Sequence, residues 1–110
     1  MNPEFEKIVE TEYSERFDEI RKGMMVMSYY KYGPLKDNYG TYKGLKAIPN
    51  LEARLQKYKE TGNTEFLADV ANFAMLEFMH PSVEGAHYKP TDDGACKIIG
   101  VSVNELKSFK

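Results

Sequence analysis

Hydrophobic residues in the first thirty positions recur every three or four residues, which is the spacing of one face of an α-helix. The residues on this face are Phe5, Ile8, Val9, Tyr13, Phe17, Ile20, Met24 and Met27. Asn2 is a suitable N-cap, and Pro3 fits a first turn because its missing N–H would have no partner there. We therefore predict one long amphipathic helix to about Tyr30, bent or broken near Gly23.

The Lys-Tyr-Gly-Pro segment at residues 31–34 ends this helix, because the residue before a proline avoids the helical conformation. A connector rich in glycine, tyrosine and lysine follows over residues 35–47. Three tyrosines lie in or next to it, at Tyr32, Tyr39 and Tyr42. We expect this loop to pack on the helical body or on a ligand.

A second helix is predicted to begin at Ile48-Pro49-Asn50, with Asn50 as the N-cap. Its inner face is formed by Leu51, Leu55 and Tyr58. Gly62 then ends this helix, and Asn63 caps a third helix that ends at His80-Pro81. Because the link is so short, the second and third helices must form an antiparallel hairpin.

Beyond the third helix, residues 82–100 lack periodicity and contain several Gly, Pro and Asp residues, which indicates an irregular loop. Residues 102–105, Ser-Val-Asn-Glu, have the form of a capping box and predict a short closing helix. The predicted fold is all-α: a single domain over residues 1–110, built as a bundle of three main helices plus a short C-terminal helix.

The third helix is apolar at nearly every angle around its axis, so it must be covered on most sides. Three principal helices cannot easily surround it, and we expect a second copy of the chain to complete the bundle as a homo-oligomer, for instance a homodimer. The same helix carries one polar stripe, formed by Glu65, Asp69 and Asn72. Polar groups in such a helix need partners or a bound ligand.

Charge and composition exclude several classes of protein. With 15 basic and 17 acidic residues the net charge is -2, which disfavours nucleic acid as a partner. No apolar run reaches the roughly 20 residues that span a bilayer, and the 42% hydrophobic content is too high for a disordered chain. A lone cysteine, Cys96, and the absence of signal-peptide features at the start predict a cytoplasmic protein without a membrane partner.

The polar stripe offers only oxygen ligands, which a hard cation such as Mg²⁺ requires. The first helix adds three carboxylates within about one turn, at Glu15, Asp18 and Glu19. If these faces meet, Asp69 and Glu65 could share Mg²⁺ with Glu15 and Glu19. The alternative is structural: the helix dipole favours Glu65, a buried arginine or tyrosine holds Asp69, and the first-helix acids form a solvated face.

Lysines and tyrosines near the connector are candidates for binding a nucleotide. Lys31 and Lys43, with Lys36 and Lys46, can hold phosphates, while Tyr32 can stack on a base. The same residues are ordinary loop content. Asn72 is a further candidate for contacting the substrate.

Other chemistry has little support in the sequence. His80, His87 and Asp92 are irregularly spaced for a transition-metal site, and His80 is better explained as closing a helix. No nucleophile elbow, Walker loop, Gly-rich dinucleotide turn or Cys-x-x-Cys pair is present. Hydrolase triads and Rossmann oxidoreductases are therefore excluded.

Three segments together resemble the small MazG-like proteins of phages and prophages: Lys31-Tyr32-Gly33, residues 50–58 and residues 65–74. The similarity extends over residues 15–92. These proteins are similar to the all-alpha nucleoside triphosphate pyrophosphohydrolases. The resemblance implies a helical bundle assembled as dimers or tetramers, and magnesium-dependent cleavage of a nucleotide to a monophosphate and pyrophosphate.

The acidic motifs of that enzymatic family are incomplete in this chain. The family pairs Glu-Glu-x-x-Glu on one helix with Glu-x-x-Asp on the next. Asp69 matches the final acid, but Phe66 stands three residues before it and Glu65 is displaced by one position. No Glu-Glu-x-x-Glu string occurs, and Glu15, Asp18 and Glu19 form only a loose substitute.

Two hypotheses follow. In the first, the chain is a nucleotide-binding protein with pyrophosphohydrolase activity, in which Asp69 and Glu65 are catalytic with Mg²⁺ as cofactor. In the second, it is a non-catalytic phage or prophage protein that inhibits a host defence protein or sequesters a nucleotide signal. Asp69 and Asn72 would then hold helices together.

Overall fold

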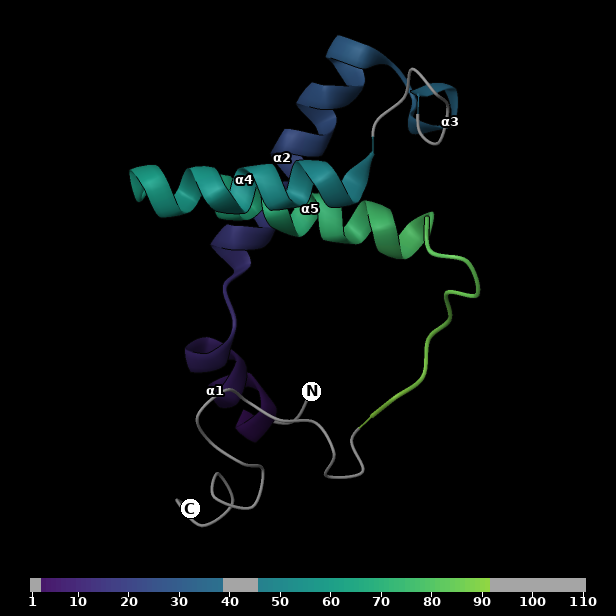
Figure 1. The fold of residues 1–110 in the computed structure, drawn as a ribbon. Helices are drawn as coiled ribbons and strands as arrows, with labels where there is room; N and C mark the ends of the chain where they lie inside the picture. The colour runs from purple at the N-terminus through teal and green to yellow at the C-terminus, as the bar shows by residue number, and fades with distance from the viewer. Residues whose placement is uncertain (1–2, 39–45, 92–110) are drawn as a thin grey trace.

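The computed structural model describes residues 3–38 and 46–91, and these residues form helices and no strand. The helices are α1 (Pro3–Glu12), α2 (Glu15–Tyr32), α3 (Leu35–Asn38), α4 (Ala47–Thr61) and α5 (Glu65–Met79), as Figure 1 shows. The predicted all-α class is therefore confirmed. The predicted closing helix at residues 102–105 lies outside the described residues, as do Tyr39, Tyr42, Lys43, Asp92 and Cys96.

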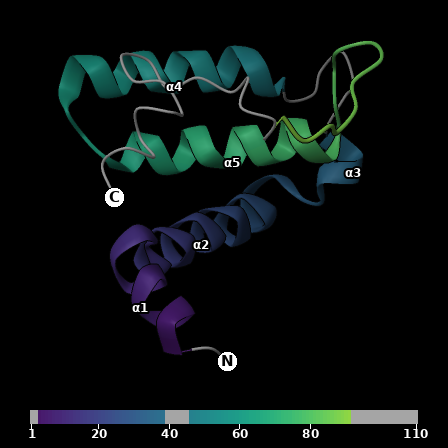
Figure 2. The same cartoon turned by 90° about the horizontal axis from the view of Figure 1, so that it is seen from below.

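The predicted antiparallel hairpin is formed by α4 and α5, which lie side by side along most of their length (Figures 1 and 2). Gly62 ends α4 in the left-handed conformation, with φ 73°, and its N–H donates to the Tyr58 carbonyl over 2.7 Å. The Asn63 side-chain oxygen then accepts the Glu65 N–H over 3.1 Å. Gly62 therefore ends α4 as predicted. The N-cap residue of α5 is Thr64, one position after the predicted Asn63, although the Asn63 side chain still bonds the first N–H of the helix.

Helix α5 lies between α4 and α2, and this position explains why it is apolar at so many angles. Figure 2 shows α4 along one side of α5 and α2 crossing the other side. The buried hydrophobic residues of the described chain are Ala47 on α4 and Ala68 and Leu76 on α5. The predicted inner face of α4 is half-buried at Leu51, Leu55 and Tyr58.

The prediction of one continuous helix to about Tyr30 was wrong, because the chain breaks between α1 and α2. Ser14 has an extended backbone there, and its hydroxyl accepts the Phe17 N–H over 3.0 Å. A serine side chain that caps the following turn competes with continuing the preceding helix. Gly23, where the break was expected, lies inside α2.

Helix α4 begins four residues earlier than its predicted N-cap, Asn50, implies. It starts at Ala47, and Lys46 is its N-cap residue without a side-chain capping bond. Asn50 lies inside the first turn, where its side-chain amide donates to the Lys46 carbonyl over 2.7 Å. Pro49 is tolerated in this turn because the first N–H groups of a helix have no intrahelical acceptor.

The connector predicted at residues 35–47 contains a short helix, α3, before the segment outside the described residues. At the far end of the hairpin, the His80 N–H donates to the Leu76 carbonyl and α5 ends as predicted. Residues 82–91 form neither helix nor strand, in agreement with the predicted loop. Among the described helices, none has the length and apolar character needed to cross a membrane.

Candidate functional site

The polar stripe of α5 divides between two neighbouring helices. Asp69 is directed to α4, where its carboxylate pairs with Arg54, while Asn72 is directed to α2, where its amide bonds the Arg21 backbone. The two positions are three residues apart along the helix, so their side chains leave it about 60° apart. Glu65, at the start of α5, is exposed. The stripe therefore has different surroundings at each of its three positions.

Asp69 is half-buried beside a single cation. The Arg54 Nε atom lies 3.6 Å from the Asp69 Oδ2 atom, which is an ion pair but too long for a good hydrogen bond. Burial raises the pKa of the Asp69 carboxyl, and the nearby Glu65 carboxylate adds to this, while Arg54 acts in the opposite direction. The raised pKa means that the ion pair does not compensate fully for lost hydration.

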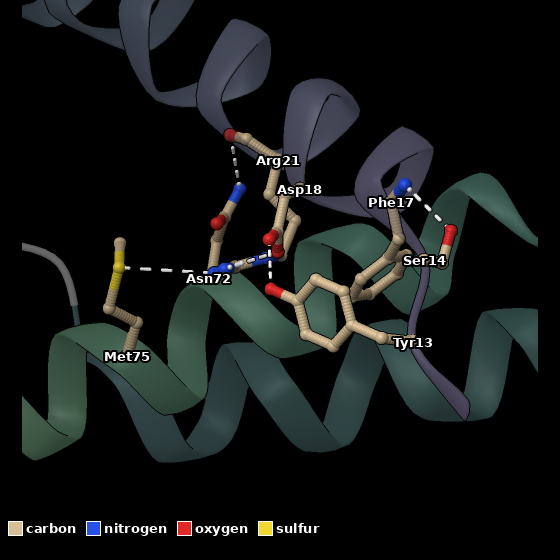
Figure 3. A network of polar contacts seen from close by, with 7 residues as sticks. All are labelled: Tyr13, Ser14, Phe17, Asp18, Arg21, Asn72 and Met75. Atoms are coloured by element: carbon tan, nitrogen blue, oxygen red, sulfur yellow. Dashed lines mark hydrogen bonds and ion pairs between the residues drawn. The ribbon is translucent and has the colours of Figure 1, made fainter. Parts of the chain in front are cut away.

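Asn72 joins α5 to α2 and is 6% exposed. Its side-chain Nδ2 atom donates to the Arg21 carbonyl over 3.1 Å, a bond between residues 51 positions apart (Figure 3). Its Oδ1 atom is buried without a protein partner in the described structure. Burying an amide with one unsatisfied oxygen costs free energy, so packing alone does not explain why an asparagine stands at this position.

Arg21 organises a second polar cluster on α2, shown in Figure 3. Its Nη2 atom bonds the Asp18 Oδ1 atom at 3.0 Å, and its guanidinium lies 5.8 Å from the centre of the Phe17 ring. The other end of the guanidinium approaches the Met75 sulfur on α5 at 4.0 Å. Thus Arg21 contacts α5 through both its side chain and its backbone carbonyl.

Both carboxylate oxygens of Asp18 accept hydrogen bonds from neighbouring side chains, so this residue has a structural role. The Tyr13 hydroxyl donates to one carboxylate oxygen, and Arg21 binds the other. These bonds, with that of Tyr13 the stronger influence, lower the pKa of the Asp18 carboxyl. The same bond raises the pKa of the Tyr13 hydroxyl, because the neighbouring carboxylate disfavours a phenolate. This pair fixes the corner between α1 and α2.

The structure does not bring the predicted metal ligands together within one chain. In the described residues, no three His, Cys, Asp or Glu side chains converge in a way that could hold a metal ion. Glu15 and Glu19 are exposed on α2, and Glu65 is exposed at the start of α5. With Asp69 paired to Arg54, these residues do not fit a Mg²⁺ ion in a single copy of the chain.

The candidate nucleotide contacts lie far along α2. Lys31 is in its last turn and Tyr32 is its final residue, and both are exposed, Tyr32 by 71%. Lys43 lies outside the described residues. Of the two histidines, His80 closes α5, and the His87 Nδ1 atom lies 2.9 Å from the Gly85 carbonyl oxygen.

Sequence reasoning overlooked two arginines. Arg54 was the unnamed partner in the structural interpretation of Asp69, and Arg21 was not considered. A signal for Arg21 was available, since Asp18 and Arg21 are three residues apart, a spacing at which helical ion pairs form. No local pattern identifies Arg54, because its partner is on another helix.

The comparisons with known proteins give no match. No family model, curated protein or solved structure matches this chain.

Proposed function

We propose that this chain is a non-catalytic, MazG-like interaction protein of a phage or prophage, which works as a homo-oligomer and acts by binding a protein of the host. The observation that supports this most is the exposure of large apolar side chains on α2 and α5. Phe78 is 72% exposed, Met79 52%, and Met27 58%. Apolar side chains that gather in one exposed patch are characteristic of sites that bind other proteins.

The small core supports the same proposal. The described chain buries three hydrophobic residues, two of which are alanines, and no large side chain is fully buried. A core of this size gives one chain little hydrophobic stabilisation. A second copy covering the free sides of α2 and α5 would enlarge it, in line with the dimers or tetramers that the family resemblance implies.

The state of Asp69 is the third support. An interaction protein can use this carboxylate to hold α5 on α4 through Arg54, whereas a metal-dependent hydrolase needs it free for a metal ion. We expect no release of pyrophosphate when the protein is incubated with a panel of nucleoside triphosphates and magnesium. Turnover that disappears in Asp69→Asn, with the melting temperature and mass unchanged, would overturn the proposal.

The oligomer can be tested at Phe78. We expect light scattering after gel filtration to give a multiple of the 12.6 kDa chain mass. The variant Phe78→Asp should shift the protein towards the monomer, because a charge would be buried in the interface. Val83→Asp is the matched control, since Val83 is also exposed, by 66%, but lies beyond α5. A monomer at all concentrations, or equal effects of both substitutions, would contradict this interface.

The second candidate is the nucleoside triphosphate pyrophosphohydrolase, favoured by one observation. Burial raises the pKa of the Asp69 carboxyl, and Glu65, one turn away on the same helix, adds to the shift. Carboxyls with raised pKa values beside a second acid often occur in functional sites. The nucleotide panel above separates the two candidates directly, because only this one predicts pyrophosphate release.

A further inference from the structure

The corner between α1 and α2 forms a groove away from the hairpin. It is lined by Phe5, Glu6, Val9, Glu10, Tyr13 and Glu15. The main contacts between the described helices join α4 to α5 and α2 to α5. Helix α1 has no buried residue. Figure 1 shows α1 set apart from the hairpin, at the end of α2. Within the described residues, no other helix therefore buries this side of α1.

The apolar part of the groove follows one side of α1. Phe5, Val9 and Tyr13 are spaced four residues apart, so their side chains form a ridge along the helix axis. Phe5 and Tyr13 are each 56% exposed. Side chains four residues apart on one helix pack between the side chains of a second helix, which is the usual way that two helices pack.

The corner keeps this ridge in place through local bonds. Ser14 caps α2, the Tyr13 hydroxyl bonds Asp18, and the Tyr13 N–H donates to the Val9 carbonyl over 3.1 Å. These contacts join the end of α1 to the first turn of α2. The groove is thus formed before a partner arrives, which lowers the entropic cost of binding.

The charges beside the ridge define the chemistry of the partner. Glu6, Glu10 and Glu15 line the groove, and within the described chain none of them forms an ion pair. Helix α1 as a whole carries four glutamates against one lysine. Anionic membranes and nucleic acids would be repelled, whereas a helix with lysine or arginine beside an apolar stripe would be attracted.

We propose that this groove binds a basic amphipathic helix of a partner protein. An apolar face would cover Phe5, Val9 and Tyr13, and its cationic residues would pair with Glu6, Glu10 and Glu15, as in other complexes that hold a helix in a groove. The inference rests on the proposed function, namely that the chain acts by binding a protein. It adds the location of the site and the character of the partner.

The test uses the full chain and a fluorescent, helical peptide of leucine and lysine, about 18 residues long so that its helix is stable. We expect saturable binding by fluorescence anisotropy that weakens as salt is raised. A peptide with glutamate in place of lysine should not bind. A peptide of the same composition without an apolar face should bind at least about tenfold more weakly.

Matched variants locate the site. Glu6→Gln with Glu10→Gln should weaken binding about tenfold, whereas Glu12→Gln with Glu84→Gln makes the same change of charge outside the groove and should have little effect. Phe5→Ala should likewise weaken binding, while Ile8→Ala should not, because Ile8 is 53% exposed on α1 but does not line the groove.

Three results would overturn the proposal: no binding, equal effects of target and control variants, or equal binding of the peptide without an apolar face. If the groove substitutions change the mass of the protein in the absence of peptide, the groove is instead an interface between copies of the chain. Light scattering on the same samples keeps the two proposals distinguishable. If the peptide does not bind but the protein is still an oligomer, only this inference is refuted.

Discussion

The α4–α5 hairpin and the α1–α2 arm are both helical pairs joined by short links, but they are stabilised differently. The hairpin is the site of hydrophobic burial, through Ala47, Ala68 and Leu76. Neither α1 nor α2 contains a buried residue, and their corner depends on the hydrogen bonds of Ser14 and Tyr13. Burial can stabilise a pair of helices by itself, whereas local bonds mainly fix an angle and leave apolar faces for a partner.

The largest expected difference between the two regions comes from truncating an apolar side chain. Leu76→Ala in the hairpin should lower the free energy of unfolding by about 2–5 kcal/mol, because Leu76 is 3% exposed and its loss leaves a cavity. Ile8→Ala in α1 should cost about 0.5 kcal/mol or less. Urea denaturation of both variants provides the measurement. Similar losses would show that α1 is packed as firmly as the hairpin.

Glycine substitutions should act with opposite sign in the two regions. Gly62→Ala should destabilise by about 1–2 kcal/mol, because φ is 73° in the hairpin turn and an alanine is strained there. Gly23→Ala, inside α2, should stabilise by about 0.5–1 kcal/mol, since a glycine in a helix costs conformational entropy. Neither new Cβ would meet another atom within 4 Å. Thermal unfolding of the two variants should shift in opposite directions, and a shift in the same direction would contradict both assignments.

The helix caps provide a smaller contrast. Ser14→Ala should cost about 1 kcal/mol, because it removes the bond to the Phe17 N–H at the start of α2. Thr64→Ala should be nearly neutral, since Thr64 makes no capping bond at the start of α5. Hydrogen exchange at the first turn of α2 should accelerate only in the Ser14 variant. Unchanged exchange there would mean that the corner does not depend on this cap.

Two carboxyls should make the smallest contributions to the free energy of unfolding, and these contributions should change in opposite directions as pH rises. The raised pKa of Asp69 adds stability that is present below the ordinary pKa of aspartate and is lost as pH rises through the raised value. The lowered pKa of Asp18 adds stability that is present above the ordinary value and is lost as pH falls through the lowered one. Carboxyl NMR titrations measure both directly. Titration of both at the ordinary value would remove this contrast.

Local patterns predicted the hairpin well and the arm poorly. Gly62 can adopt the left-handed conformation that ends a helix, and the Asn63 side chain can bond the first N–H of the next helix. Because both properties belong to the residues themselves, the turn could be located from the sequence. The break at Ser14 was missed because apolar residues keep their helical spacing across it, from Tyr13 to Phe17. The hydrophobic pattern there gave the wrong answer, although a serine before a glutamate is a known start of a helix.

The candidate site shows the same division between local and distant information. The sequence alone determined that the fold is all-α, that α4 and α5 pair, and that α5 carries three polar residues on one side, because these follow from spacing along the chain. Only the tertiary structure decided that Asp69 pairs with Arg54 and that Asn72 bonds Arg21. Both partners belong to other helices, and the angle at which those helices cross α5 depends on packing rather than on local sequence.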